Sequence, residues 1–216
     1  MLGRGFKKVA VVWEQSDWGQ TVVSNYVDAI KAKGGEVVFT EFFNRGVQDF
    51  RPIITKVARE KPDAMYTGFF YEDAAQFLKQ VKQLGVTIPV HSTSAAYNAQ
   101  TLTLAGDAAE GMHLTVTFLP NSPEPHVQEF VKLWKDKTGQ AEPGQFPAQA
   151  YDAVGIVLAA LERSFPNPTR QKVRDELAKT AGYPGVTGET TFDANREPAK
   201  KLTKAVVKGG QFIATT

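Results

Sequence analysis

Aromatic and hydroxyl side chains follow three of the strands that the sequence predicts, each at the end of its strand. Trp18 follows the first strand, Phe69-Phe70-Tyr71 the third, and Ser92-Thr93-Ser94 with Tyr97 the fourth. Because the carboxyl ends of parallel strands meet at one edge of a sheet, these side chains can face a common crevice. Aromatic walls with a few hydroxyls suit a small organic ligand. The candidate ligand-binding residues are Trp18, Phe70, Tyr71, Ser92, Ser94 and Tyr97.

The alternative is that Phe69 and Phe70 both belong to the core and that only Tyr71 is exposed. Successive side chains of a strand point to opposite faces, so one of the two phenylalanines must lie in the core in either case. The crevice is favoured for the group as a whole more than for any single residue.

Signatures of catalysis and of metal binding are absent from the sequence. No glycine-rich phosphate loop follows the first strand, and neither a Gly-x-Ser-x-Gly elbow nor a His-Glu-x-x-His pair occurs. There is no cysteine, and His91, His113 and His126 lack metal-ligand spacing. His91 precedes the serine-rich strand end, but a single histidine there favours a structural role. The sequence predicts no enzyme, no metal site and no cofactor.

Composition indicates an ordinary globular chain. The 216 residues include 42% hydrophobic and 22% charged side chains, and the net charge of +2 comes from dispersed lysines and arginines. Dispersed charge argues against a nucleic-acid partner, since a phosphate-binding face concentrates its cations. No apolar run approaches the length that spans a bilayer, and residues 1–8 lack the apolar core of a signal peptide. We expect a soluble chain without an export signal.

The first half of the chain alternates strands with helices, which is typical of parallel βαβ units with right-handed crossovers. Asp49 is the expected N-cap of the second helix, with Pro52 in its first turn. Strands are expected at 9–14, 36–42, 64–70, 89–93 and 111–118, and helices at 20–33, from 50, at 72–84 and at 97–104.

After the proline-rich connector 119–125, helices dominate, at 126–138, 147–165 and 170–180. The tail predicts two strands around 192–196 and a turn at Gly209-Gly210. The helix 147–165 is apolar on most sides, which requires partners on most sides. One apolar face could be formed by Ala150, Val154, Val157, Leu158 and Leu161, and apolar surface spreads around the helix through Tyr151, Ile156 and Ala159.

Five motifs, in their order and spacing along nearly the whole chain, give it a recognisable likeness. The chain resembles the later part of a type I periplasmic binding protein of the branched-chain amino-acid family of ABC importers. The motifs are Lys8-Val9-Ala10-Val11-Val12 with Asp17-Trp18-Gly19-Gln20, Gln48-Asp49-Phe50, Gly68-Phe69-Phe70-Tyr71, Ala105-Gly106-Asp107-Ala108-Ala109-Glu110-Gly111 and Phe192-Asp193-Ala194-Asn195.

The resemblance implies an α/β fold: a parallel-sheet sandwich lobe, with extra helices from an incomplete other lobe. Residues 7–118 would form ligand-binding lobe 2, residues 119–191 a helical segment of lobe 1, and residues 192–216 a return to lobe 2. The sheet of lobe 1, normally encoded ahead of Lys7, would be missing. We therefore expect a truncated or engineered half-protein that self-associates through the exposed 147–165 helix.

The resemblance also implies the substrate-binding component of an ABC importer, or a fragment of one, which works with a membrane permease in the periplasm or another extracytoplasmic space. Trp18 and Phe70 fall at the family's aromatic positions in lobe 2. Ser94 falls where amino-acid binders carry an acid for the α-ammonium group, and a hydroxyl supplies no such charge. An amide, a carboxylate or an aromatic acid is then as suitable a ligand as a branched-chain amino acid.

Two other functions remain open. The same fold serves as the ligand-sensing domain of regulators and receptors, which gene context would distinguish from transport. An enzyme on a flavodoxin-like sheet would need an acid/base pair or a cofactor loop at the strand ends, and the sequence offers neither.

Overall fold

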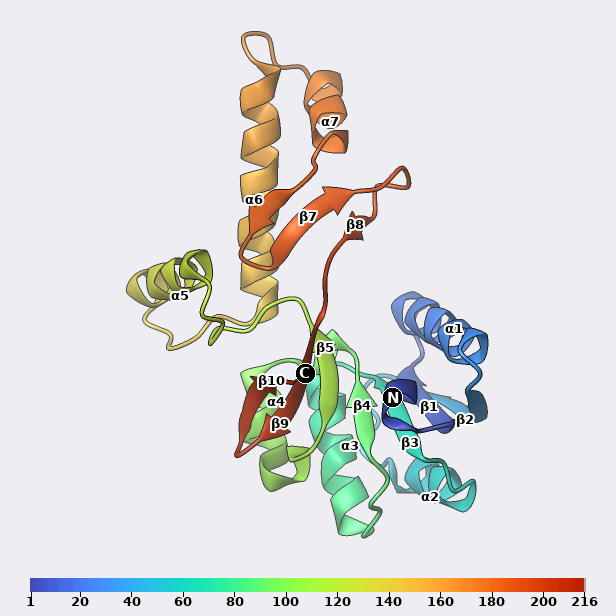
Figure 1. Cartoon of the computed structure of the whole chain (residues 1–216). Helices are drawn as coiled ribbons and strands as arrows, with labels where there is room; N and C mark the ends of the chain where they lie inside the picture. Colours follow the sequence, from blue (N-terminus) through green and yellow to red (C-terminus); the bar gives the residue numbers. More distant parts are fainter. Residues whose placement is uncertain (216) are drawn as a thin grey trace. The chain divides into compact units, whose positions relative to one another are not determined.

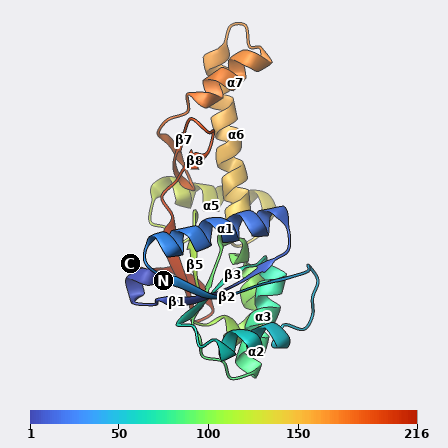
Figure 2. The ribbon, with the colours of Figure 1, turned by 90° about the vertical axis from the view of Figure 1, so that its right-hand side faces the viewer.

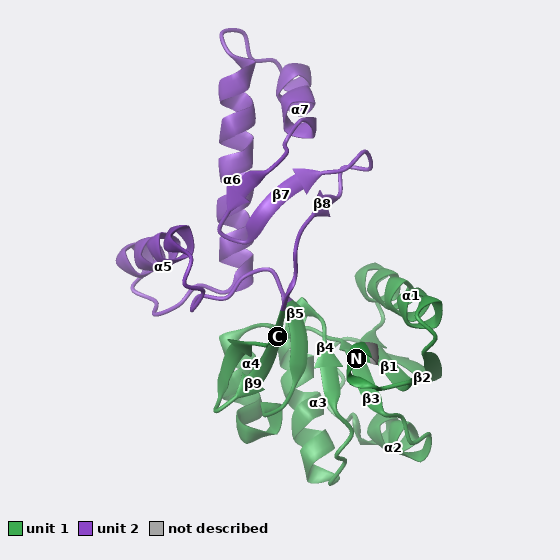
Figure 3. Ribbon diagram, viewed as in Figure 1, with its two compact units in different colours: residues 1–115, 204–216 green, residues 116–203 purple. Residues whose placement is uncertain are grey.

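The computed structural model describes residues 1–215, apart from the side chain of Leu2. The chain divides into two units (Figure 3): unit 1 holds residues 1–115 and the C-terminal residues from Lys204 on, and unit 2 holds Val116–Thr203. These boundaries differ from the expected ones, most at the return to unit 1. Strand β7 (Gly188–Phe192) pairs with β8 (Pro198–Ala199), and this pairing keeps residues 192–199 in unit 2.

Unit 1 is built on a seven-stranded sheet of order β10-β9-β5-β4-β3-β1-β2 (Figure 1). Strands β1 to β5 run parallel to one another, and β9 and β10 form an antiparallel hairpin whose turn is the expected Gly209-Gly210. The expected mostly parallel α/β sheet is confirmed. Its strands are β1 Lys8–Glu14, β2 Glu36–Phe43, β3 Ala64–Gly68, β4 Val90–Ser92, β5 His113–Val116, β9 Thr203–Lys208 and β10 Gln211–Ala214.

The helices of unit 1 lie close to their expected positions, with shifts at their starts. They are α1 Asp17–Ala32, α2 Arg51–Arg59, α3 Tyr71–Gln83 and α4 Ala99–Ala105, joined by the short 3-10 turns Leu2–Arg4, Ser94–Ala96 and Gly106–Ala109. The residue at the N-cap of α2 is Phe50, not Asp49 as expected. The Asp49 carboxylate instead accepts hydrogen bonds from the backbone N–H and the Nε of Arg51.

Helix α1 covers one face of the sheet, and α2 and α3 lie on the other, as both views show (Figures 1 and 2). Under α1, Val9 and Val11 pack with Val23 and Ile30. The opposite face carries a cluster of phenylalanine rings at centroid distances of 4.8–5.8 Å. Its members are Phe43, Phe50, Phe69 and Phe77, all 4% exposed or less.

Unit 2 contains helices α5 (Pro125–Thr138), α6 (Gln145–Ser164) and α7 (Arg170–Ala178) and a three-stranded antiparallel sheet. The sheet runs in the order β6 (Tyr183–Gly185), β7 and β8. The tail from Val186 on was expected to hold two strands, and four short ones, β7 to β10, begin within it. Thr169 caps α7, its side chain accepting from the N–H of Lys172.

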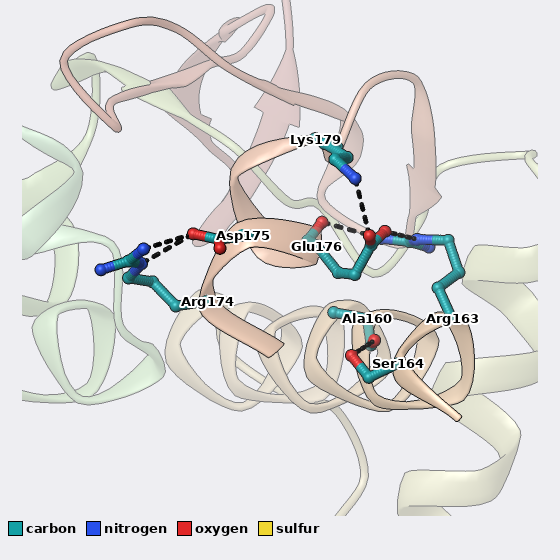
Figure 4. A network of polar contacts seen from close by, with 7 residues as sticks. All are labelled: Ala160, Arg163, Ser164, Arg174, Asp175, Glu176 and Lys179. Atoms are coloured by element: carbon teal, nitrogen blue, oxygen red, sulfur yellow. Dashed lines mark hydrogen bonds and ion pairs between the residues drawn. The ribbon is translucent and has the colours of Figure 1, made fainter. Parts of the chain in front are cut away.

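Helices α6 and α7 are joined by a polar network (Figure 4). The carboxylate of Glu176 on α7 accepts from Arg163 Nε on α6 at 3.2 Å and from Lys179 Nζ at 2.7 Å. At the end of α6, the Ser164 hydroxyl is buried and donates to the Ala160 carbonyl oxygen at 2.8 Å. Because this hydrogen bond satisfies the hydroxyl, a polar residue can lie on the buried side of α6 at its last turn.

Part of the apolar surface of α6 is exposed, and a different row of its residues is buried. Val154, Val157 and Leu158 are 59%, 46% and 53% exposed. The buried row is Ala148, Asp152, Ile156 and Ala160, spaced every four residues. The reason is Asp152, whose buried carboxylate accepts hydrogen bonds from the β6–β7 turn and so decides which side of α6 faces the small sheet.

Candidate functional site

The candidate residues lie at the carboxyl edge of the parallel sheet of unit 1, where β1, β3 and β4 end at Glu14, Gly68 and Ser92. Ligands of open α/β sheets bind beyond this edge. The structure brings two of the predicted residues into ring contact: the centroids of Trp18 and Phe70 are 4.7 Å apart, with their planes tilted by 37°. Both side chains are half-buried, so they form one aromatic surface that solvent reaches. We call Trp18 and Phe70 the aromatic wall.

Local backbone chemistry places Trp18. The Ser16 hydroxyl accepts the Gly19 N–H at 3.1 Å, which starts α1 at Asp17 and puts Trp18 in its first turn. The expectation that Trp18 lies in a loop ahead of a later helix start is therefore wrong. A Cβ at Gly19 would lie 2.1 Å from the Glu14 carbonyl oxygen, so only glycine lets α1 begin this close to β1.

Adjacent phenylalanines take opposite roles at the end of β3. Phe69 is fully buried in the phenylalanine cluster, whereas Phe70 is half-buried and turns to Trp18. This confirms that one of the pair is core. Phe70 is the N-cap residue of α3 with an extended backbone (ψ 171°), which lets α3 start at Tyr71 beside the wall.

Charged groups surround the wall. The Arg45 guanidinium carbon lies 5.6 Å from the centroid of the Phe70 ring, and the Tyr71 hydroxyl donates to Glu72 Oε1 at 3.3 Å. Asp73, in the first turn of α3, is buried. Burial raises the pKa of the Asp73 carboxyl, the charge of Glu14 adds to that rise, and Arg45 opposes it. Glu14 is 4% exposed, and its Oε2 has no hydrogen-bond partner among the described residues.

The other predicted residues differ in how accessible their side chains are to a ligand. Ser94 is half-buried and begins the short turn after β4. Ser92 is 3% exposed, and its hydroxyl donates to the Thr67 carbonyl oxygen at 3.2 Å. Tyr97 is 6% exposed and packs edge-on against Phe212, with centroids 4.7 Å apart. Both side chains therefore pack inside unit 1. Ser92 bonds to the neighbouring strand β3, and Tyr97 packs on Phe212 of β10.

Sequence reasoning missed Arg45 and Glu14. Both could have been found by the rule that located Trp18, because Glu14 is the last residue of β1 and Arg45 lies two residues beyond the end of β2.

Larger hollows exist elsewhere in each unit. One of about 690 Å³ in unit 1, lined by Arg4, Phe6, Pro89 and His113, lies where β4 and β5 begin, opposite the carboxyl edge. One of about 1240 Å³ in unit 2 lies along α6, α7 and the β7–β8 hairpin. Two of its polar residues already make hydrogen bonds. The Asp152 carboxylate accepts from backbone N–H groups of the β6–β7 turn, and Lys200 Nζ donates to the Thr187 hydroxyl. The carboxyl edge differs from both hollows in presenting two aromatic rings in contact beside an exposed arginine.

His91 has a structural environment. Its ring stacks on His113 with centroids 4.9 Å apart and meets the edge of Phe6. Burial, with smaller contributions from His113 and Arg4, lowers the pKa of His91 to about 3, so the ring is neutral near pH 7. The described part of the chain contains no group of three or more metal-ligating side chains. Nor does it contain a helix with the length and apolarity to cross a membrane.

Comparison with known proteins gives a consistent result. Residues 1–211 match the family model described as periplasmic binding protein. A leucine-, isoleucine-, valine-, threonine- and alanine-binding protein of Pseudomonas aeruginosa is 28% identical over 190 residues, which are 87% of this chain and 49% of the relative. The chain thus spans about half the length of the curated relatives it matches.

Solved structures show the same fold. A Rhodospirillum rubrum structure assigned to branched-chain amino acid ABC transport is 40% identical, with a TM-score of 0.88, and the match covers 100% of this chain and 62% of that one. A solute-binding protein of a Rhodopseudomonas palustris ABC transporter, solved with benzoate, has a TM-score of 0.88 at 22% identity, with 99% and 59% of the two chains covered.

Proposed function

Because the chain belongs to the periplasmic binding protein family, we propose that it supplies one solute-binding surface of the substrate-binding protein of an ABC importer. The family consists of solute-binding proteins, not enzymes; its members work outside the cytoplasm and deliver small molecules to ABC permeases. The observation that carries the proposal is the aromatic wall at the carboxyl edge of a parallel sheet. We propose no nucleic-acid partner, since the positive charge is dispersed.

Within this proposal, Trp18 and Phe70 hold the apolar part of the solute, and Tyr71 and Ser94 border it. Unit 1 corresponds to lobe 2 and the helices of unit 2 to lobe 1. The solute is a small organic molecule: a branched-chain amino acid, an amide or an aromatic acid. The name of the Pseudomonas relative supports the first class, and the benzoate held by the Rhodopseudomonas protein supports the last.

Truncation of the wall is expected to abolish solute binding. In an NMR titration with L-leucine and with benzoate, we expect the Trp18 indole N–H resonance to shift in the wild-type chain and the binding to disappear in Phe70→Ala. The Trp134 indole, on α5 of unit 2, serves as the internal reference, and Trp134→Phe as the matched variant that binds normally. If neither solute shifts Trp18, or if Phe70→Ala binds both unchanged, the wall is not the site.

The affinity of this chain alone is expected to be low. Closure of two lobes contacts a ligand from both sides, and one surface supplies only part of those contacts. Calorimetry with L-leucine should give a dissociation constant well above about 1 μM. A tighter constant would contradict the one-surface account.

We also propose that the exposed face of α6 causes this chain to self-associate. Tyr151, Val154 and Leu158 lie on adjacent turns and are 47%, 59% and 53% exposed, a continuous apolar stripe of the kind that soluble proteins cover. The occupant that we propose is a second copy of the chain, which carries the same apolar stripe, so that the two faces can cover each other.

Charge on that face is expected to disperse the assembly. Light scattering should give a mass above 23.7 kDa that rises with concentration for the wild type and falls to that of a monomer for Val154→Asp/Leu158→Lys. Leu104→Lys, at a 44% exposed leucine on α4, is the control that should associate like the wild type. A wild type that stays monomeric at high concentration contradicts the proposal.

A further inference from the structure

We propose that Arg45 selects solutes that carry a carboxylate, and that the wall next to it takes their ring, so that the solute class is a small aromatic carboxylate. The inference rests on the proposed function, because it assumes that the aromatic wall is the binding surface. It goes beyond that function in naming the charged residue and the ligand class.

The first argument is the geometry of three side chains from three separate segments. Arg45 stands just beyond β2, Phe70 at the end of β3 and Trp18 at the start of α1. The Arg45 guanidinium carbon is 5.6 Å from the Phe70 centroid, and that ring is 4.7 Å from Trp18. A guanidinium over an aromatic ring is held by cation–π attraction, and its N–H groups stay available for a carboxylate.

The second argument is that the charge of Arg45 is available. Its side chain is exposed, and it takes part in none of the ion pairs or hydrogen bonds found among the described side chains. Arg51 contrasts with it in the same unit, since Asp49 accepts from its Nε at 2.7 Å. A cation that is fixed on a ring but unpaired is suited to an incoming anion.

The third argument concerns the acids nearby, which might favour a cationic solute instead. Glu14 Oε2 is closed off from solvent, and Asp73 is only 9% exposed, so both residues are largely buried. Glu72 is exposed, but it already accepts the Tyr71 hydroxyl. The charge of Arg45 also offsets that of Asp73. The charged group that lies over the Phe70 ring and reaches solvent is the Arg45 guanidinium, from which we infer a preference for anions.

Three probes of one shape and different charge test the inference: benzoate, benzamide and benzylammonium. Their dissociation constants are measured by NMR titration of the full chain at low ionic strength, followed at the Trp18 indole. We expect benzoate to bind best and benzylammonium worst. Arg45→Gln should weaken benzoate about three- to fivefold, as for a solvated ion pair, and leave benzamide unchanged. The control Arg59→Gln, at an exposed arginine on α2, should change neither.

The outcomes separate this inference from the proposed function. If all three probes bind with equal dissociation constants, or if Arg45→Gln leaves the dissociation constant of benzoate unchanged, the proposed role of Arg45 is wrong, whereas the aromatic wall remains the binding surface. If benzylammonium binds best, the buried acids determine the charge preference and the inference is wrong. If no probe shifts Trp18 and L-leucine also fails to do so, the proposed function itself falls. A circular dichroism spectrum of Arg45→Gln that matches the wild type excludes misfolding as the cause of weaker binding.

Discussion

Replacing Phe69 with alanine is expected to lower the free energy of unfolding of unit 1 by about 3–5 kcal/mol. The ring is fully buried and lies 4.8 Å from Phe43, 5.8 Å from Phe50 and 5.0 Å from Phe77. Its removal forfeits the transfer free energy of a phenyl group and leaves a cavity among rings that cannot easily collapse into it. Urea unfolding followed by hydrogen exchange at the amides of β1 and β3 measures the loss in unit 1 separately from unit 2.

Phe70→Ala is the matched control, since it removes the same ring from the next residue. Phe70 is half-buried and packs on Trp18 at the surface, so we expect a loss of about 1 kcal/mol together with the loss of solute binding. The two variants should thus separate stability from binding within one dipeptide. Equal destabilisation by both would contradict the assignment of Phe69 to the core and Phe70 to the wall.

Replacing Asp152 with alanine is expected to destabilise unit 2 by about 3 kcal/mol or more, because several buried donors lose their acceptor at once. The carboxylate is 3% exposed, and it accepts the Val186 N–H at 2.8 Å and the Thr187 N–H at 2.9 Å. The Thr187 hydroxyl donates to the same carboxylate. Hydrogen exchange at the amides of Val186 and Thr187 reports the loss directly, since both should lose most of their protection.

An exposed aspartate on α7 serves as the comparison for Asp152. Asp175 pairs only with the neighbouring Arg174, and Asp175→Ala should change stability by about 0.5 kcal/mol or less. Asp152→Asn should fall between the two alanine variants, because its amide keeps one acceptor oxygen. If Asp152→Ala were as stable as Asp175→Ala, the carboxylate would not be what fixes the turn between β6 and β7.

Sequence patterns were sufficient to predict much of unit 1. Short apolar runs that alternate with amphipathic segments predicted the parallel strands β1 to β5 and the helices between them. A strand buried on both faces of a sheet is a continuous apolar run, as in Val9–Val12. The family followed from five motifs spread along the chain. At this level, local hydrophobic patterning and order along the chain carry enough information.

The candidate site was only partly predictable. Trp18 and Phe70 were located because strand ends of a parallel sheet share one edge, and the structure brings their rings into contact. Ser92 and Tyr97 were chosen by the same rule, yet their side chains turn inward to Thr67 and Phe212. The direction of a side chain one residue beyond a strand depends on the exact residue at which the strand ends, and sequence patterns locate that residue only to within a few positions.

The sequence by itself determined the fold class and the order of the strands and helices of residues 8–116, and it predicted the edge at which we propose that a solute binds, since each of these follows from which residues are apolar and how they are spaced. Only the tertiary structure decided which face of α6 is buried, where the chain returns to unit 1, and that Arg45 lies on the ring of Phe70. Those features depend on contacts between residues far apart in the chain. They include the hydrogen bonds of the buried Asp152 carboxylate, the pairing of β7 with β8 and the contact of Arg45 with the Phe70 ring, and local composition does not reveal such pairings.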